Sequence, residues 1–435
     1  MNIIVNKTIH RHPSVAQQVA ILVGALCLYL FIWFLSSFDS NAYIQIDSVD
    51  YRFLGKKIFT EFSFPSSFRT PVFPAFVGFW ESFLGLSVSQ FILVQIAMAL
   101  VNIWLVGRIV SYFAAEKWQL LAMIVFSLDL ITIQVANYVL SETLFSFLLL
   151  LSLHFMLALY YSKGASYGLA VITGLSLGVF ALCRPVGQFL PFLLAIWFVF
   201  FRFQSNEGGE NKKQIYLMTI IMILGSMAVM HAWKLNNFIN KGHYFVSATT
   251  SYNMYNYRAA WNVAYRDGRT FFDVKKEFHD KRDQFKRDNP QLSDYEIANH
   301  FTKEGLNIIL STPKETFFQA VRGLVFLYGG VYNGSLARIF QQNWSQKIAQ
   351  IYSLIYLGLL YLGILLALYY WRTMNAQQKA LFALSTVIVF YFTFFSIGVE
   401  SYARLRAPFM PYLAIISVLG WIQCVHIRRQ KNSIK

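Results

Sequence analysis

Charged residues and cysteines are scarce in this chain of 435 residues. Only 13% of the residues are charged and 56% are hydrophobic, whereas an ordinary soluble domain has roughly 25% charged residues. The three cysteines, Cys27, Cys183 and Cys424, are far apart in the sequence and lie in or beside apolar segments, so they indicate neither a disulfide framework nor a metal site. HExxH, paired CxxC and GxxxxGK[ST] motifs are missing, which argues against a zinc protease or a nucleotide-driven pump.

Long apolar runs recur along the chain and predict an all-α, polytopic membrane protein. A span needs about 20 mainly apolar residues. The predicted spans are 15–35, 88–106, 118–134, 139–160, 167–183, 186–203, 215–233, 348–371, 380–397 and 408–425. The apolar segments 71–86 and 315–332 carry Glu81 and Arg322, and we expect them to lie in the membrane interface because a charge in mid-bilayer is costly.

The net charge of +16 follows from lysines and arginines that flank these spans. This distribution favours membrane topology over nucleic-acid binding. With both ends in the cytoplasm, we expect a seven-span module at 1–233, whose first external loop is 36–87. A small, mainly helical external unit at 234–347 would follow, and then three spans and a basic tail at 348–435. This topology predicts that the loops 36–87 and 234–347 lie on the external side of the membrane.

Under this topology the unusual polar residues gather on the external side. Each has an alternative role as a helix cap, a helix-to-helix ion pair or a headgroup anchor. Asp50 in particular is a candidate cap, and Asp129 lies within an apolar run. Helical spacing would place Tyr138 and Glu142 on one face. Carboxylates and arginines that converge on one side of the bundle suit the binding of an anionic phosphate and the deprotonation of a hydroxyl group. The candidates are Asp47, Asp50, Tyr51, Arg69, Asp129, Tyr138, Glu142, Arg184, Glu400, Arg404 and Arg406.

Five short motifs in this order resemble the C-type glycosyltransferase superfamily. They are Asp47-Ser48-x-x-Tyr51, Phe68-Arg69-Thr70-Pro71-x-x-Pro74, Leu140-Ser141-Glu142, Arg184-Pro185 and Arg404-x-Arg406-x-Pro408. The likeness is to the bacterial protein-mannosyltransferase-like and aminoarabinose-transferase-like enzymes, and it spans nearly the whole membrane portion. It implies a bundle of about ten membrane helices with interfacial helices in the external loops.

The resemblance also implies a reaction and roles for residues. A polyprenyl-phosphate-linked sugar would be transferred, with inversion, to a lipid, glycan or protein acceptor. Asp47 matches the expected base, with Asp50 as the fallback, and Arg69 matches a residue that binds the carrier phosphate. Arg184, Arg404 and Arg406 would assist Arg69. Some relatives use a divalent metal, magnesium or manganese, and the acids here leave that question open.

Three other functions remain as alternatives at this stage. A flippase or transporter of lipid-linked saccharides and a polysaccharide polymerase would also use external arginines, whereas a purely structural scaffold would leave the one-sided charge unexplained. The sugar and the acceptor are not specified by the sequence. Tyr252, Tyr255 and Tyr257 of the external unit are candidates for stacking on an acceptor sugar, although packing of the unit would explain them equally well.

Overall fold

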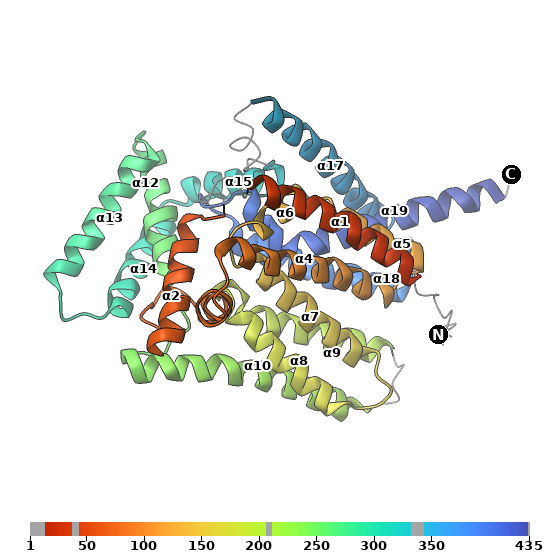
Figure 1. The fold of residues 1–435 in the computed structure, drawn as a ribbon, viewed down its shortest axis with the longest axis horizontal. Coiled ribbons are helices and arrows are strands. Elements are labelled where there is room, and N and C mark those ends of the chain that lie inside the picture. The colour runs from red at the N-terminus through yellow and green to blue at the C-terminus, as the bar shows by residue number, and fades with distance from the viewer. Residues whose placement is uncertain (1–13, 37–42, 206–210, 332–342, 434–435) are drawn as a thin grey trace.

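The computed structural model describes residues 14–36, 43–205, 211–331 and 343–433, and every regular element in these ranges is helical. Figure 1 shows long helices running side by side, with a cluster of shorter helices, α11 to α14, at one end of the bundle. Helix α1 (Val15–Ser36) begins and α19 (Met410–Ser433) ends at the opposite end. The chain is an all-α polytopic membrane protein, as its composition predicts.

Within the described ranges, eight helical segments are long and apolar enough to cross a membrane. They contain α1, α4 (Val88–Ser111), α7 (Glu142–Tyr160), α9 (Leu190–Ser205), α10 (Lys212–Lys241), α17 (Asn343–Tyr369), α18 (Ala376–Ser396) and α19. A bent pair, α5 (Glu116–Ser127) and α6 (Leu130–Ala136), makes a ninth. Helix α8 (Tyr167–Ala181) is apolar but has only 15 residues. The ten expected spans therefore correspond to eight full-length segments, one bent pair and one short helix.

Two of the expected spans do not run as one uninterrupted helix. The pair α5 and α6 bends by 66°. Asp129 accepts a hydrogen bond from the Thr132 backbone N–H (2.9 Å) and so caps a new helix. Helix α7 begins at Glu142 rather than near 139, because residues 137–141 are not helical. The expectation that Tyr138 and Glu142 share a helical face was therefore wrong.

Helix α8 packs closely against α10 through glycines. A Cβ atom on Gly174 would lie 2.4 Å from the carbonyl oxygen of Met222, and one on Gly178 would lie 2.8 Å from that of Ser226. Small residues allow such close approach between membrane helices. The spacing Gly174-x-Ser176-x-Gly178 also matches the GxSxG pattern of serine hydrolases. Here it lies within a continuous helix, where Ser176 donates to the Thr173 carbonyl (2.9 Å), and it serves packing.

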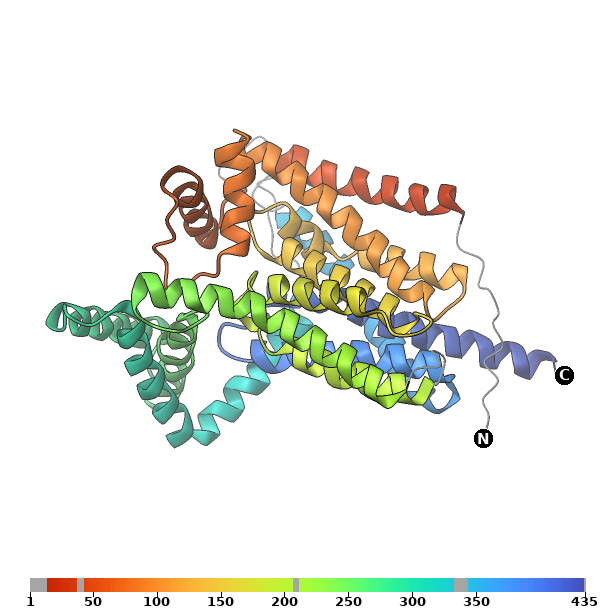
Figure 2. The same cartoon turned by 90° about the horizontal axis from the view of Figure 1, so that it is seen from below.

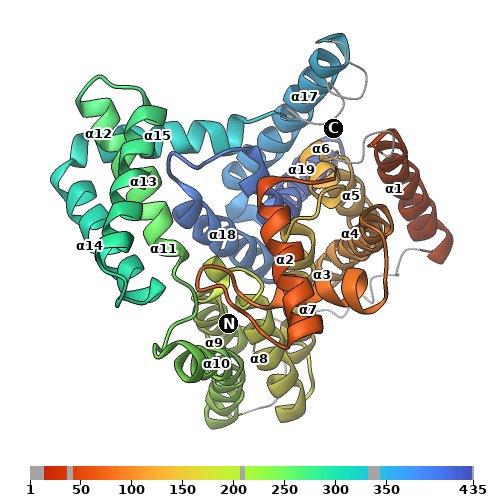
Figure 3. The same cartoon turned by 60° about the vertical axis from the view of Figure 1, so that its left-hand side comes forward.

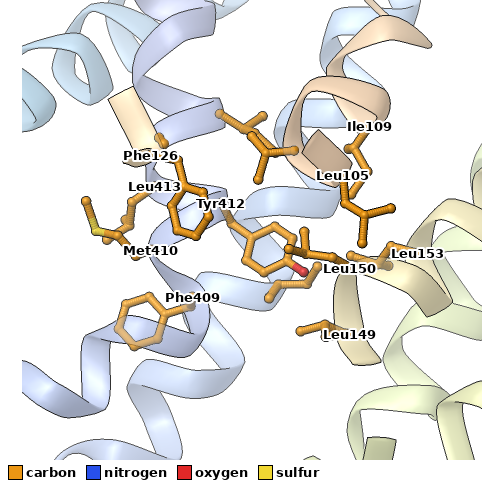
Figure 4. Packing of buried hydrophobic residues seen from close by; sticks show 14 of the residues in the cluster. Leu105, Ile109, Phe126, Leu149, Leu150, Leu153, Phe409, Met410, Tyr412 and Leu413 are labelled. Atoms are coloured by element: carbon orange, nitrogen blue, oxygen red, sulfur yellow. The ribbon is translucent and has the colours of Figure 1, made fainter. Parts of the chain in front are cut away.

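The apolar core of the bundle lies among α4, α5, α7 and α19. Figure 4 shows Leu105, Phe126, Leu150 and Tyr412 from these four helices converging on one another. Each of these four side chains is at most 1% exposed. Seen from below, α1 and α4 lie on one side of the bundle and α10 lies on the other (Figure 2). The core therefore holds the helices whose outer ends carry the charged residues described below.

Short helices cover the end of the bundle opposite the start of α1 and the end of α19, and this end is labelled the outer end below. The first loop folds into α2 (Ile46–Glu61), α3 (Val72–Gly78) and η1 (Phe79–Phe83). The second region, the external unit, is a run of short helices. They are α11 (Thr249–Ser251), η3 (Tyr252–Ala259), α12 (Ala260–Arg266), α13 (Phe271–Asp288), α14 (Asp294–Ser311) and α15 (Pro313–Gly329). Helix α15 matches the helix expected near 315–332, and α10 continues eight residues beyond its predicted end at 233.

Candidate functional site

Helix α2 carries Asp47 in its first turn and is anchored to the bundle beneath it. Ser48 donates to the carbonyl of Val139 (2.8 Å), and the Val139 N–H donates to the carbonyl of Tyr43 (3.0 Å). Gln45 is the N-cap residue, so Asp50, which lies one turn into the helix, is not the cap that the sequence allowed. Viewed from the outer end, α2 crosses the bundle and the external unit lies beside it (Figure 3). Asp47 is thus fixed at the outer face of the bundle.

The segment that carries Arg69 is held from two sides. On the bundle side, Thr70 donates to the carbonyl of Cys183 (3.2 Å), next to Arg184. On the other side, the Ala248 N–H donates to the carbonyl of Ser67 (2.8 Å), at the start of the external unit. Arg69 therefore sits where the first loop, the bundle and the external unit meet.

Arg69 and Arg404 hold Asp47 between them. Arg69 Nη2 lies 2.9 Å from Asp47 Oδ1 and also 2.9 Å from Asp50 Oδ2, while Arg404 Nη2 lies 2.8 Å from Asp47 Oδ2. The Arg69 guanidinium also stacks over the Tyr51 ring, 4.8 Å from its centroid. Both oxygens of Asp47 are thus engaged by arginines, one 22 residues and the other 357 residues away in the sequence.

Glu142 extends the same chain of charges into the bundle. Its Oε1 lies 2.6 Å from Arg404 Nε and 2.7 Å from Arg184 Nη1, and its side chain is 0% exposed. Three carboxylates and three arginines therefore alternate in the order Asp50, Arg69, Asp47, Arg404, Glu142 and Arg184. The formal charges cancel, which lets Glu142 remain ionised at a buried position. We call this set the charge network.

A small cavity with both polar and apolar side chains in its lining lies next to Glu142 of the charge network. Glu142 and Asn102 line it together with Thr132, Thr143 and Ser146. Glu142 Oε2 and Asn102 Oδ1 are buried and lack a hydrogen-bond partner in the described part of the chain. A water molecule has the two donors that these acceptors need, since buried polar groups of this kind are commonly satisfied by water.

The two arginines determine the protonation state of Asp47. Burial alone would raise the pKa of this carboxyl group, but the charges and hydrogen bonds of Arg404 and Arg69 outweigh burial and lower it to about 2. The same pairing raises the pKa of Arg69 against the effect of its own burial. Asp47 is therefore a carboxylate at any physiological pH, and it is a weak base while both arginines hold it.

Four other predicted site residues lie outside the charge network. Arg406 is 1% exposed and donates to the carbonyls of Leu327, Tyr328 and Gly330 at 3.0 to 3.2 Å. Asp129 is engaged as a helix cap, and its Oδ1 lies 4.0 Å from Arg406 Nη2. These contacts give Arg406 and Asp129 structural roles, whereas the sequence predicted a contact of Arg406 with the donor phosphate and a place for Asp129 in the active site.

Glu400 and Tyr138 also have other partners. Glu400 pairs with Arg258 of η3 (2.8 Å) and so ties the external unit to the segment before α19. Tyr138 is buried, and its hydroxyl accepts a hydrogen bond from Gln134. Neither side chain forms an ion pair or a hydrogen bond with Asp47 or Arg69 in the described residues.

The three tyrosines of η3 divide into two groups. Tyr255 is 0% exposed and packs against Phe278 and Phe301 with centroid distances of 4.5 and 4.6 Å. It belongs to the core of the external unit, so its expected sugar contact was wrong. Tyr252 and Tyr257 are half-buried and lie 5.4 Å apart. They remain able to meet a ligand.

Two cations beside these tyrosines were not among the predicted residues. Lys275 lies 3.9 Å from the centre of the Tyr257 ring, and Arg282 lies 5.2 Å from that of Phe68. Both belong to the charged run 275–290, whose composition is typical of a solvated helix. The sequence could have indicated Lys275 and Arg282 through their spacing of seven residues, because this spacing places both on one face of α13.

The acids present do not fit a divalent-metal centre as they are arranged. Within the described residues, no group of three or more histidines, cysteines or acids could hold a metal ion. Magnesium and manganese prefer carboxylate oxygens, and those of Asp47 are both paired with guanidinium groups. We therefore derive no reaction step through a metal.

No family model and no curated protein matches the sequence. Solved structures do resemble the fold. The oligosaccharyltransferase AglB from Archaeoglobus fulgidus, in complex with an inhibitory peptide and a dolichol-phosphate, matches 96% of this chain with a TM-score of 0.52 and 13% identity. The same enzyme tethered to an acceptor peptide gives a TM-score of 0.54, 13% identity and 97% coverage. This chain covers 52% and 51% of those chains, about half the length of the enzyme.

ArnT from Cupriavidus metallidurans bound to undecaprenyl phosphate matches 92% of this chain and 76% of its own, with 14% identity and a TM-score of 0.39. At such identities, the likeness to AglB establishes the fold alone. The chain has a fold similar to that of C-type glycosyltransferases.

Proposed function

We propose that this chain is a membrane glycosyltransferase that moves a sugar from a polyprenyl-phosphate carrier to an acceptor outside the cytoplasmic membrane. The acceptor would be a lipid, a glycan or a protein. The observation that carries this proposal is the placement of Asp47 between Arg69 and Arg404 at the outer end of the bundle. A carboxylate between two arginines provides both a proton acceptor and binding groups for a phosphate.

The end of the bundle that carries Asp47 would face the periplasm. Arg108, Lys117, Lys163 and Lys213 lie near helix ends at the opposite side, where α1 begins and α19 ends. The positive-inside rule assigns such a basic end to the cytoplasm. This orientation supports a bacterial inner-membrane protein whose donor headgroup meets the charge network from the outer leaflet.

The reaction would be a single displacement with inversion. The acceptor hydroxyl oxygen would attack the anomeric carbon, its proton would pass to a carboxylate oxygen of Asp47, and the bond between the anomeric carbon and the phosphate oxygen would break. Polyprenyl phosphate would leave with both electrons of that bond. Arginines stabilise the charge that develops on a leaving phosphate. Arg69, the more exposed of the two arginines on Asp47, is placed to do so.

Donor binding would also activate the base. While both arginines hold Asp47, the carboxylate accepts protons poorly. A phosphate that draws Arg69 toward itself would leave Asp47 with fewer positive neighbours and raise its basicity. Arg404 would stay in place because Glu142 holds its Nε at 2.6 Å. The charge network thus supports a base that becomes effective after the donor is bound.

The test compares Asp47→Asn with Asp50→Asn. Both remove one carboxylate from Arg69, but only Asp47 also contacts Arg404. We expect Asp47→Asn to lower transfer by about 10² to 10⁴-fold, the usual contribution of a general base, and Asp50→Asn to retain most of it. The measurement is mass analysis of surface glycans and proteins from a deletion strain that expresses each variant at equal membrane levels.

Three results would contradict the proposal. Full activity of Asp47→Asn would exclude it as the base, and equal loss in both variants would show that the two acids are not distinguished. An unchanged glycan profile in the deletion strain itself would remove the glycosyltransferase assignment.

A further inference from the structure

Lys275 and Arg282 are half-buried cations without a carboxylate partner in the described part of the chain. Two other lysines of α13 are paired with carboxylates, Lys281 with Glu304 (2.5 Å) and Lys286 with Asp294 (2.8 Å). Arg282 has one long hydrogen bond, 3.4 Å to Asn256 Oδ1. Burying a cation without an anion costs free energy. Lys275 and Arg282 would therefore be stabilised by an anionic partner from outside α13.

Aromatic rings surround the two cations. Lys275 lies 3.9 Å from the centre of the Tyr257 ring, and Arg282 lies between Phe68 (5.2 Å) and Tyr252 (5.9 Å). Tyr252 and Tyr257 in turn contact each other at 5.4 Å. Half-buried tyrosines offer flat apolar faces with a polar edge, a combination that suits a sugar ring. The cations would bind an acidic group on that sugar through charge-assisted hydrogen bonds.

This cluster adjoins Asp47. Phe68 precedes Arg69, whose Nη2 lies 2.9 Å from Asp47. Burial raises the pKa of the Tyr257 hydroxyl against a hydrogen bond with Tyr252 that lowers it, and the charges of Asp47 and Glu400 raise it further. The hydroxyls of Ser247 and Thr249 both donate to the carbonyl of Phe68 and hold the loop against the external unit.

We propose that Lys275, Arg282, Tyr252 and Tyr257 form a subsite for an anionic saccharide, that is, a sugar bearing a phosphate or carboxylate group. Its role as the acceptor subsite rests on the proposed function. The subsite would hold the sugar by its acidic group and its ring while a hydroxyl reaches Asp47. Neutral acceptors would leave both cations unpaired and bind more weakly.

The test measures binding directly, on the full chain in phosphatidylcholine nanodiscs with 3-fluorotyrosine at position 257. The fluorine resonance is followed during titration with glucose 6-phosphate, glucuronate or glucose. We expect a saturable shift with the two acidic sugars and none with glucose. Lys275→Gln/Arg282→Gln should weaken binding at least about tenfold, because the variant loses charge-assisted hydrogen bonds to the acidic group.

The matched control is Lys276→Gln/Arg287→Gln, which removes the same charge from exposed positions of the same helix. It should bind like the unmodified chain. Equal loss in the control, an equal response to glucose, or no saturation with either acidic sugar would overturn the inference. Displacement of glucose 6-phosphate by undecaprenyl phosphate would also overturn it, because the subsite would then belong to the donor.

Asp47→Asn separates this inference from the proposed function. The variant should still bind both acidic sugars, because Asp47 does not contact either cation. Saturable binding of the acidic sugars by the unmodified chain, without any transfer, would exclude the glycosyltransferase proposal and keep the anionic-saccharide site. Transfer by the unmodified chain without saturable binding of the acidic sugars would keep the glycosyltransferase proposal and exclude the anionic-saccharide site.

Discussion

Arg404 and Arg406 are two residues apart, yet the structure uses them in opposite ways. Arg404 contacts the carboxylates of Asp47 and Glu142 at the outer end of the bundle. Arg406 is 1% exposed and donates to three carbonyls at the end of α15. Both belong to the 3-10 helix η5 (Ala403–Phe409), in which two residues are separated by about 240° around the axis. A short motif can therefore combine one residue of the site with one residue of the scaffold.

The largest effect should come from exchanging the two arginines for glutamine one at a time. Arg404→Gln should lower transfer by about 10² to 10³-fold, because Asp47 and Glu142 both lose their ion pair with Arg404. Glu142 keeps its ion pair with Arg184 in this variant. Arg406→Gln should leave transfer per folded molecule largely intact but lower the free energy of unfolding by about 2 to 4 kcal/mol, since buried carbonyls lose a charged donor. Thermal unfolding in detergent and transfer at equal membrane levels measure the two effects. A stable but inactive Arg406→Gln variant would break the distinction.

A change in the packing of α2 on α3 should displace Asp47, the partner of Arg404, and leave the contacts of Arg406 with the end of α15 intact. A Cβ atom on Gly78 would lie 2.3 Å from the carbonyl oxygen of Gly55, so Gly78→Ala must push α2 away from its position. Displacement of Asp47 by about 1 Å should lower transfer on the order of 10²-fold. The overpacking should also lower the free energy of unfolding by about 1 to 3 kcal/mol.

Gly24→Ala is the control for this variant, because a Cβ atom there meets nothing within 4 Å. Hydrogen exchange should show looser protection of α2 in Gly78→Ala, with α15 unchanged. Unaltered transfer in Gly78→Ala would mean that the position of α2 does not set the geometry of the base.

The smallest effect is a shift in pH dependence. Asp47 works as a carboxylate, so activity is present above its pKa and is lost as the pH falls through it. Burial and the two arginines together place the pKa at about 2. Arg69→Gln removes one arginine and should move the pKa upward, toward the ordinary aspartate value of about 3.9.

The acid limb of kcat/KM, which reports the free enzyme, should therefore move to higher pH in Arg69→Gln. Arg52→Gln is the control, because Arg52 pairs with Glu81 (2.6 Å) and makes no ion pair with Asp47. An acid limb that moves equally in both variants would indicate that Asp47 is not the titrating group.

Much of the fold follows from apolar run length. All ten predicted spans coincide with helices, because a bilayer requires internally hydrogen-bonded segments of about 20 apolar residues. The breaks were harder to predict. Asp129 ends one helix and caps the next within an apolar run, and residues 137–141 leave the helix before Glu142. A capping bond from Asp129 accompanies the first break, and at the second the Val139 N–H donates to the carbonyl of Tyr43 instead of a helical partner. Hydropathy averaged over a span registers neither bond.

The site was predicted in part. Asp47, Asp50, Arg69, Glu142, Arg184 and Arg404 were all singled out from the sequence, and they form the charge network. Arg406, Asp129 and Tyr255 were singled out on the same grounds and lie elsewhere, because side-chain direction depends on local helix type and on packing. Lys275 and Arg282 were missed, since a charged helix face looks the same in sequence whether it meets solvent or a neighbouring loop.

The sequence by itself determined that this chain is a helical membrane protein with its unusual charges in the segments between spans, because the free energy of burying apolar and charged groups depends on composition and run length. Only the tertiary structure decided which of those charges meet. Asp47 and Arg404 are 357 residues apart and lie 2.8 Å from each other. Such a contact depends on how α2, α7 and η5 pack against one another, and no local pattern in the sequence records that.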